Sequence, residues 1–400
     1  LKNMGEYRRP HYNLMLSRLS ERRKCIFVLA GPRQVGKSTV MAQIAESIDK
    51  VVFQFNADSV NEEDSDWIRR SWESVRSRMD IQHLQEAVLV IDEIQKIRRW
   101  SEYVKREWDA DTLNHVNLKV VLLGSSRLLL RKGLTESLAG RFELIRMGHW
   151  TFPEMKAAFG LSLQQWIYFG GYPGSVDYIG DFRRWRKYVK DSLVAPAIEK
   201  DVLLTSNIYK PSLMSQLFEV GCSYSGELLS LTKMLGQLQD AGNVTTLSSY
   251  LEILKQANLL CGLQKFACDE ARKRRSIPKF TVFNNALFTA YRGKGFDKDY
   301  VDPMIWGRWV ESAVGTCLLD FVEDNDCHLY YWRDHNNEVD YILESQGDFV
   351  AIEVKSGKRG MNSGIPMFQE KFHPLKSIVV GTDGIPFEEF FCMDIMQLFE

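Results

Sequence analysis

A glycine-rich segment directly after an apolar run has the residue types and spacing of a phosphate-binding loop. Residues 25–30 read Cys-Ile-Phe-Val-Leu-Ala, which is typical of a buried strand, and residues 39–47 have a helical pattern. In a Gly-x-x-x-x-Gly-Lys-Ser loop between strand and helix, backbone N–H groups surround the β- and γ-phosphates, the lysine adds a charge and the serine hydroxyl ligates Mg²⁺. The sequence therefore predicts a nucleoside triphosphate site formed by Gly31, Pro32, Arg33, Gln34, Val35, Gly36, Lys37, Ser38 and Thr39.

A second apolar run ends in two adjacent carboxylates. Residues 87–91 read Ala-Val-Leu-Val-Ile, and Asp92 and Glu93 follow them. A phosphate-binding loop that hydrolyses its nucleotide needs an acidic group at the end of a neighbouring strand. We expect Asp92 to hold Mg²⁺ through water and Glu93 to orient or deprotonate the attacking water.

Two further residues have a functional and a plainer interpretation. Ser125 follows the strand-like run 119–124, where a polar side chain would sense the γ-phosphate, but Ser125 or Ser126 could equally cap a helix that begins there. Arg141 could be an arginine finger, in its own site or that of a neighbouring copy, because such a residue stabilises charge in the transition state. The alternative for Arg141 is an ordinary surface arginine.

A second group of chemically suggestive residues lies near the C-terminus. Asp340 follows a predicted hairpin turn, and alternation along the next strand places Glu353 and Lys355 on one face. Asp340 and Glu353 could bind Mg²⁺ while Lys355 polarises a phosphate or the attacking water. Glu311, on a helical segment at 309–323, could add a fourth group. Cleavage of nucleic acid and a salt-bridged cluster kept for packing or docking are both consistent with this set.

The elements that position these residues alternate between strand and helix. Strand-like runs at 25–30, 51–56, 87–92, 119–124 and 144–147 are separated by helix-compatible segments, which predicts an α/β domain with a largely parallel sheet. Residues 303–400 have the pattern of a further α/β unit, with a helix followed by strand-like runs at 329–332, 338–343, 349–354 and 377–380.

Residues 212–284 have the pattern of three helices and a hairpin. The predicted helices contain Phe218, residues 228–238 and residues 247–260, and the hairpin spans 262–283. In a helix-turn-helix arrangement, Thr245, Thr246, Ser248 and Tyr250 would approach DNA while the basic run 272–275 contacts phosphates. The alternative is a protein–protein joint whose basic run is a solvated hairpin tip.

Length and composition exclude several classes of protein. With 400 residues, 45% apolar and 26% charged, the chain has the composition of an ordinary soluble globular protein. Its net charge of −1 argues against a wholesale basic coat for nucleic acid. The chain has neither an apolar window long enough to span a membrane nor a signal core at its basic N-terminus. The seven cysteines show no Cys-x-x-Cys pair, so we expect reduced thiols and a cytoplasmic protein with no membrane partner.

Residues 22–150 resemble the AAA-type ATPases of bacteria and archaea whose phosphate-binding loop reads Gly-Pro-Arg-Gln-Val-Gly-Lys. That family also has Asp-Glu-Ile-Gln-Lys after a strand (here 92–96), Gly-Ser-Ser (124–126) and Gly-Arg-Phe (140–142). Gly-Gly-Tyr-Pro at 170–173 and Glu-Lys-Asp-Val at 199–202 fit its helical lid, whereas Arg98 stands where the family usually has proline. The resemblance implies ATP as the nucleotide, a winged-helix-like unit and a fused C-terminal region.

The C-terminal residues resemble the PD-(D/E)xK nuclease fold. Its acidic residue, Glu-x-Lys pair and helical glutamate fall on Asp340, Glu353, Lys355 and Glu311. We therefore expect an α/β protein with four parts: an AAA-type P-loop ATPase core (1–151), a helical lid (152–205), a winged-helix-like unit (206–298) and a restriction-endonuclease-like α/β domain (299–400).

The expected function is Mg²⁺-dependent binding and hydrolysis of ATP, coupled to a nuclease-like domain that faces nucleic acid. One alternative is a nucleotide-dependent switch that cuts nothing. Another is a DNA-binding regulator whose ATPase controls assembly. The expected partners are DNA, a protein partner or further copies of the chain.

Overall fold

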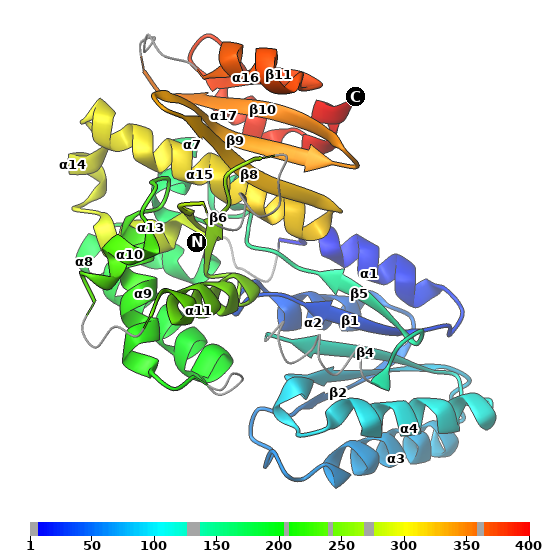
Figure 1. The fold of residues 1–400 in the computed structure, drawn as a ribbon. Coiled ribbons are helices and arrows are strands. Elements are labelled where there is room, and N and C mark those ends of the chain that lie inside the picture. Colours follow the sequence, from blue (N-terminus) through cyan, green and yellow to red (C-terminus); the bar gives the residue numbers. More distant parts are fainter. Residues whose placement is uncertain (1–6, 126–136, 204–207, 239–242, 268–275, 358–363) are drawn as a thin grey trace. The chain divides into compact units, whose positions relative to one another are not determined.

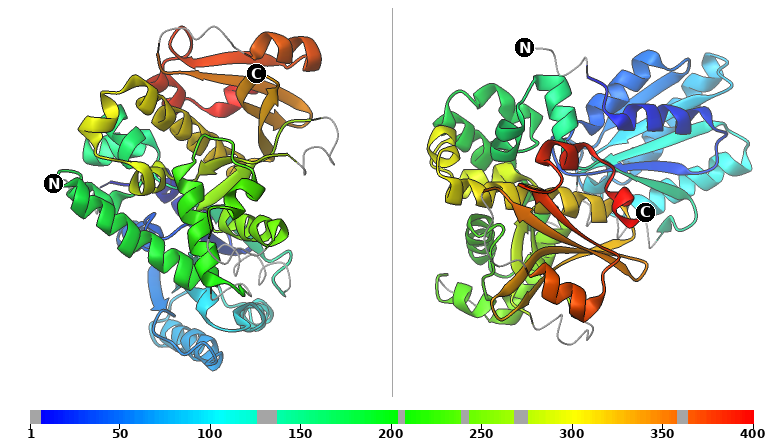
Figure 2. Two further views of the ribbon diagram at one scale, coloured as in Figure 1. Left: turned by 60° about the vertical axis from the view of Figure 1, so that its left-hand side comes forward. Right: turned by 90° about the horizontal axis from the view of Figure 1, so that it is seen from above.

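The chain forms two compact units, Leu1–Gly148 and His149–Glu400 (Figure 1, Figure 2). The computed structural model describes residues 7–125, 137–203, 208–238, 243–267, 276–357 and 364–400. Among these residues, no helix combines the length and apolarity that a membrane span requires. The finer division into four parts stays a prediction.

The first unit is built on a five-stranded parallel sheet. Its strands lie in the order β2-β3-β4-β1-β5, and each neighbouring pair is parallel. This arrangement confirms the predicted α/β domain, and the strand bounds differ from the predicted runs by two residues or fewer. The strands are β1 (Ile26–Ala30), β2 (Val51–Asn56), β3 (Ala87–Asp92), β4 (Leu118–Gly124) and β5 (Phe142–Arg146).

Helices cover both faces of this sheet (Figure 1). Alternation along β4 decides which side chains meet which helices, because Val121 and Leu123 join one core and Val120 and Leu122 the other. The first core contains α1 (Pro10–Ser20) and α2 (Lys37–Ser47), and the second contains α3 (Asp66–Ile81), η1 (Ile94–Lys96) and α4 (Trp100–Leu113).

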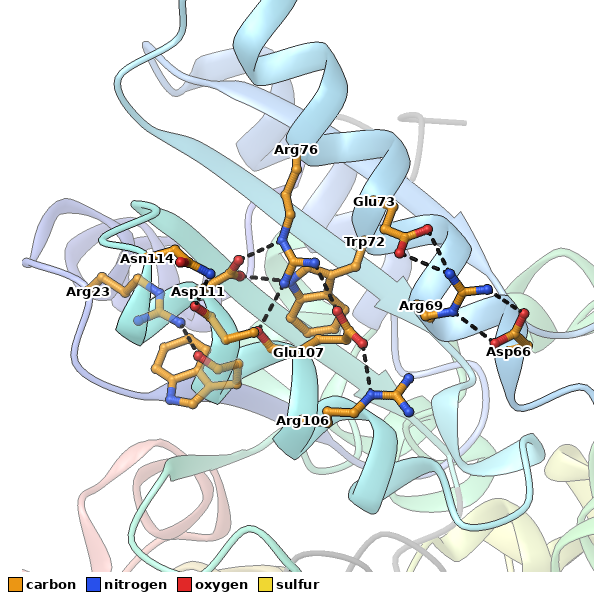
Figure 3. Close-up of polar contacts among 12 residues, drawn as sticks. Arg23, Asp66, Arg69, Trp72, Glu73, Arg76, Arg106, Glu107, Asp111 and Asn114 are labelled. Atoms are coloured by element: carbon orange, nitrogen blue, oxygen red, sulfur yellow. Dashed lines mark hydrogen bonds and ion pairs between the residues drawn. The ribbon is translucent and has the colours of Figure 1, made fainter.

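A buried carboxylate joins α3 to α4 (Figure 3). Asp111 is 1% exposed and accepts hydrogen bonds from Trp72 Nε1 at 2.8 Å and Arg76 Nε at 2.7 Å. Arg76 also pairs with Glu107 at 2.8 Å. Burying a charge is costly unless it is paired and hydrogen-bonded, so these contacts fix one helix against the other.

The second unit begins with helical segments, as the sequence predicts. Gly170 ends α7 with a φ of +71°, and a Cβ there would lie 2.1 Å from Asn284 Oδ1. The Gly-Gly-Tyr-Pro break is therefore required for close packing. The segments are α6 (Phe152–Phe159), α7 (Leu163–Phe169), η2 (Pro173–Tyr178), α8 (Phe182–Tyr188) and the π-helical η3 (Val189–Val194) and η4 (Ala197–Leu203).

Three helices and a hairpin follow, with bounds that differ from the prediction. The second helix is shorter than predicted. The third starts at Val244 because Asn243 caps it, accepting from Thr246 N at 2.8 Å, and it ends before Leu260, which begins a strand. The elements are α9 (Pro211–Ser223), α10 (Leu231–Leu235), α11 (Val244–Gln256), β6 (Leu260–Leu263), β7 (Lys279–Val282), α13 (Asn285–Arg292) and α14 (Phe296–Tyr300).

Not all the residues of this region that were predicted to contact DNA are exposed. Tyr250 is buried, and its hydroxyl accepts from Lys210 N at 3.0 Å, so its predicted approach to DNA is wrong. The Thr246 hydroxyl donates to Asn243 Oδ1 at 3.0 Å. The basic run 272–275 lies outside the described residues.

A long helix and a mixed four-stranded sheet complete the chain. The strand order is β11-β10-β9-β8, with only the β10–β11 pair parallel, and α15 and α16 lie on opposite faces (Figure 1). The first helix starts six residues before the predicted segment because Asp302 caps it. The elements are α15 (Pro303–Asp324), β8 (Cys327–Asp334), β9 (Asn337–Ser345), β10 (Asp348–Lys355), α16 (Ile365–Phe372), β11 (Lys376–Gly381), α17 (Phe387–Cys392) and η5 (Ile395–Phe399).

Candidate functional site

The predicted phosphate-binding loop connects β1 to α2 at the carboxyl edge of the parallel sheet. Gly36 has a φ of +96°, which favours glycine, and α2 begins at the next residue, Lys37. A Cβ on Gly31 would lie 2.0 Å from the carbonyl oxygen of Met147, so a side chain there would displace the backbone. The geometry of the loop thus requires glycine at both positions of the motif, 31 and 36. The N-terminus of α2 lies where it would favour binding of an anion.

Lys37 is held within this loop. Its side chain is buried, and Nζ donates to the carbonyl oxygens of Gly31 and Pro32, both at 2.8 Å. These contacts fix a positive charge beside the backbone that would receive the phosphates.

The two predicted magnesium ligands of the first unit converge. Ser38 Oγ donates to Asp92 Oδ2 at 2.5 Å, although the residues are 54 positions apart. Asp92 Oδ1 accepts from the backbone N–H of Glu93 at 2.9 Å. A hydroxyl and a carboxylate are hard oxygen ligands of the kind that Mg²⁺ prefers, so this pair fits a magnesium ion bound with a nucleotide.

Glu93 is oriented by two neighbouring side chains. Its Oε2 accepts from Gln95 Nε2 at 2.6 Å and from Ser125 Oγ at 3.0 Å. Ser125 therefore contacts the predicted catalytic carboxylate, whereas the alternative candidate Ser126 lies outside the described residues. The role of Gln95 was not predicted. Its position two residues after Glu93, within the acidic motif, could have indicated that it contacts this carboxylate.

Arg141 lies at the opposite edge of the sheet from the phosphate-binding loop. It directly precedes β5, whose five residues pair in parallel with β1. At ~3.3 Å per residue, this strand separates Arg141 from the carboxyl edge by about 16 Å. Its guanidinium pairs with Asp109, Nε to Oδ1, at 2.8 Å. An arginine finger in its own site is therefore excluded by the described geometry, and a role in a neighbouring copy stays a prediction.

Arg9 is a loop-supporting residue that the sequence analysis missed. It is 3% exposed, and one guanidinium nitrogen, Nη1, donates to the carbonyl oxygens of Val35 at 3.0 Å and Gly148 at 3.1 Å. The same side chain thus contacts the phosphate-binding loop and the last residue of the first unit. Only a basic lead-in was visible in the sequence, without a signal that one arginine would be buried.

The C-terminal Asp and Glu-x-Lys residues also come together. Lys355 Nζ pairs with Glu353 Oε1 at 2.6 Å, so the two lie on one face of β10 as alternation predicts. Asp340 Oδ2 accepts from the backbone N–H of Val354 at 2.7 Å. Glu353 is 4% exposed, and its Oε2 is buried without a hydrogen-bond partner among the described residues.

A buried lysine that the sequence analysis missed lies among these carboxylates. Lys279 Nζ is 2.6 Å from Glu311 Oε1 and 3.7 Å from both Glu338 Oε1 and Asp340 Oδ1. It also donates to the carbonyl oxygen of Asp340 at 3.2 Å and lies 4.7 Å from the centre of the Tyr341 ring. Its burial could not be predicted from the sequence, because a lysine at the start of a short strand usually reaches solvent.

The charges of this cluster perturb one another. Burial raises the pKa of Glu311 to about 7, against the opposing effect of Lys279. Burial and then repulsion from Asp340 raise the pKa of Glu353 to about 7. Burial alone would lower the pKa of Lys279, but the carboxylates of Glu311 and Asp340 outweigh burial and raise it well above its usual value. Lys279 is therefore a permanent cation at neutral pH.

These residues do not fit the predicted magnesium site. The ammonium of Lys279 already contacts Glu311 and approaches Asp340, and a divalent cation between them would be repelled by it. Among the described residues, no group of three or more histidine, cysteine, aspartate or glutamate side chains is arranged to hold a metal ion. The buried ammonium beside Asp340 argues against this Mg²⁺ site, and ligation by Asp340 and Glu353 stays a prediction.

Comparisons with known proteins identify the first unit. Residues 23–156 match the family model described as "AAA domain", and the unit is an AAA-type P-loop ATPase domain. Residues 160–298 and 306–396 match two domains of unknown function, DUF8612 and DUF4143.

The relatives of the whole chain are distant. Uncharacterized proteins of Mycobacterium tuberculosis and Mycobacterium bovis are each 24% identical over 336 residues, which cover 82% of this chain and 70% of theirs. Among solved structures, the Walker-type ATPase of Pyrococcus abyssi is 13% identical, with coverage of 72% of this chain and 97% of that chain and a TM-score of 0.46.

Proposed function

We propose that the first unit binds ATP together with Mg²⁺ and hydrolyses it. The observation that carries this proposal is the 2.5 Å contact between Ser38 Oγ and Asp92 Oδ2 beside the phosphate-binding loop. Two segments far apart in the sequence supply a hydroxyl and a carboxylate at one point. The buried ammonium of Lys37 is held within the same loop by the carbonyl oxygens of Gly31 and Pro32. Ser38 and Asp92 would hold Mg²⁺, which would supply positive charge to offset that of the nucleotide phosphates.

The side chains around this point have distinct roles. Backbone N–H groups of the loop and the first turn of α2 bind the phosphates, and Lys37 adds a fixed charge. Glu93 orients the attacking water and accepts its proton. Ser125 and Gln95 hold the Glu93 carboxylate through the hydrogen bonds that they donate to Oε2.

The ATPase serves as a nucleotide-dependent switch. Arg9 supports this role because it bonds both to Val35 in the loop and to Gly148, after which the chain enters the second unit. A loop that changes shape around its nucleotide alters one of these two bonds and so reaches the segment that leads out of the unit. The second unit, with its nuclease-like pattern, receives the signal, and DNA, a protein partner or another copy of the chain is its ligand.

Two substitutions separate binding from hydrolysis. Lys37→Ala removes the buried ammonium and should abolish both nucleotide binding and turnover. Glu93→Gln keeps the size of the side chain and should bind a fluorescent ATP analogue normally while turnover falls by about 10²–10⁴-fold, the usual contribution of a general base. Binding is measured by fluorescence titration with Mg²⁺ and with chelator, and turnover by phosphate release.

The matched control is Glu102→Gln on α4. Glu102 pairs with Arg99 three residues earlier, in an exposed position, so its loss should leave turnover unchanged. A Lys37→Ala protein with turnover equal to that of the wild type would refute the proposed ATP site.

A further inference from the structure

We propose that Lys279 is the resident cation of the carboxylate cluster in the second unit, so that the cluster holds no divalent metal and the domain cuts no nucleic acid in this fold. The inference is independent of ATP hydrolysis in the first unit. It concerns four acidic side chains, Glu311, Glu338, Asp340 and Glu353, which we call the carboxylate cluster.

The ammonium comes from a different element than the carboxylates. Lys279 begins β7, in the hairpin with β6, whereas Glu311 lies on α15 and Asp340 on β9. The Nζ atom is 2.6 Å from Glu311 Oε1 and 3.7 Å from Asp340 Oδ1. Lys279, from the predicted winged-helix-like region, thus lies at the position where a metal ion is expected from the resemblance to the PD-(D/E)xK nuclease fold.

This contact is a buried ion pair with ordered surroundings, unlike an ion pair formed by chance on the surface. The Lys279 side chain is fully buried, and its backbone is fixed by pairing with Leu263 in the hairpin. The Asp340 carbonyl oxygen accepts from Nζ at 3.2 Å, and the Tyr341 ring lies beside the ammonium. Tyr341 is itself held because its hydroxyl donates to the carbonyl oxygen of Glu311 at 2.9 Å.

One member of the cluster is a buried carboxylate. Glu353 is 4% exposed, and its Oε2 has no hydrogen-bond partner among the described residues. Burial and then Asp340 raise the pKa of Glu353, whereas Lys355 and Lys279 lower it. Without the ammonium, the oxygens of Glu311 and Asp340 that face Nζ would offer two hard ligands to a divalent cation, with water completing its coordination. Lys279 therefore supplies positive charge at the point where Glu311, Glu338 and Asp340 converge.

Mn²⁺ is the probe that tests this inference, because its binding is measured as a decrease in the electron paramagnetic resonance signal of the free ion. The full chain is used without nucleotide and with Asp92→Asn, which removes the candidate ligand of the first unit. In the protein with Lys279 intact, Asp340→Asn should not change Mn²⁺ uptake. Lys279→Ala should gain such uptake, and the gain should disappear when Asp340→Asn is added. Lys298→Ala, an exposed lysine on α14, is the matched control and should gain nothing.

Each other outcome contradicts the inference. Mn²⁺ uptake by the protein with Lys279 intact, lost on Asp340→Asn, would show that the cluster holds a metal beside the lysine. Failure of a folded Lys279→Ala protein to gain uptake would show that Lys279 does not occupy the metal position. Where alanine prevents folding, the comparison of wild type with Asp340→Asn decides on its own. Nicking of supercoiled DNA that requires Asp340 with Lys279 in place would also overturn it.

Discussion

Replacement of Lys279 by methionine should destabilise the second unit strongly. Lys279 Nζ lies 2.6 Å from Glu311 Oε1, and Coulomb's law with an effective dielectric of about 20 gives roughly 6 kcal/mol of attraction at this distance. Much of this attraction offsets the cost of desolvating both charges. Removing one partner leaves the other buried without its counter-charge, so we expect Lys279→Met to cost about 3–5 kcal/mol.

A second substitution shows how much of this cost belongs to the pair. Glu311→Gln removes one negative charge while Lys279 keeps Asp340 and Glu338 at 3.7 Å, so its cost should be smaller, about 1–3 kcal/mol. The double variant no longer buries an unpaired Glu311 charge. Its cost should therefore fall below the sum of the single costs by about 1–3 kcal/mol.

Hydrogen exchange of the full chain measures these costs locally. A chain with two compact units is not expected to unfold in one step, so exchange is followed by mass spectrometry on peptides from β9 and β10. The experiment is run at pH 8, where Glu311 of the wild type, with a pKa of about 7, is ionised. Lys298→Met, at an exposed position, should change the local free energy of opening by less than about 0.5 kcal/mol. Exchange unchanged by Lys279→Met, or costs that simply add in the double variant, would refute the role given to the buried ammonium.

Three predictions concern the first unit. Asp111→Asn should lower its free energy of unfolding by about 1–3 kcal/mol, read as a lower thermal midpoint, because the half-buried Arg76 loses one of its two counter-charges and keeps Glu107. Arg9→Ala should lower ATP turnover and raise the KM for ATP, whereas Arg8→Ala, at an exposed position, should change neither. If Arg141 acts in a neighbouring copy, Arg141→Ala and Lys37→Ala proteins, each inactive alone, should regain turnover when mixed. An Arg141→Ala protein with full turnover would show that this arginine only pairs within its own chain.

The nucleotide site could be predicted from the sequence because its signals are local. The phosphate-binding loop is one run of residues, 31–39, and the strand before it is recognisable by its apolar side chains. Asp92 also stands directly after such a strand. Since carboxyl ends of parallel strands meet at one edge of a sheet, the contact of Asp92 with Ser38 follows once both strands are assigned. Alternation along β10 was likewise enough to pair Glu353 with Lys355.

The supporting cations could not be predicted, because their surroundings are assembled over long distances. Arg9 contacts Gly148, which is 139 positions away, and Lys279 contacts Asp340, 61 positions away. Neither residue belongs to a recognisable motif. Burial of such a side chain depends on which elements pack around it, and a pattern of residue types over short windows carries no information on this point. The position of Arg141 was also not predictable. Only the parallel pairing of β5 with β1 shows that Arg141 lies at the edge of the sheet away from the phosphate-binding loop.

Two aspartates of this chain illustrate why a motif alone does not decide chemistry. Asp92 and Asp340 both belong to strands and both matched acidic positions of metal-dependent families. Asp92 accepts from a serine hydroxyl and a backbone N–H, which are neutral groups that a magnesium ion tolerates beside it. Asp340 faces the ammonium of Lys279, a permanent charge that competes with any metal for the same oxygens. We therefore expect catalysis where the carboxylate meets neutral donors, as at Asp92, and structural stabilisation where it meets a buried cation, as at Asp340.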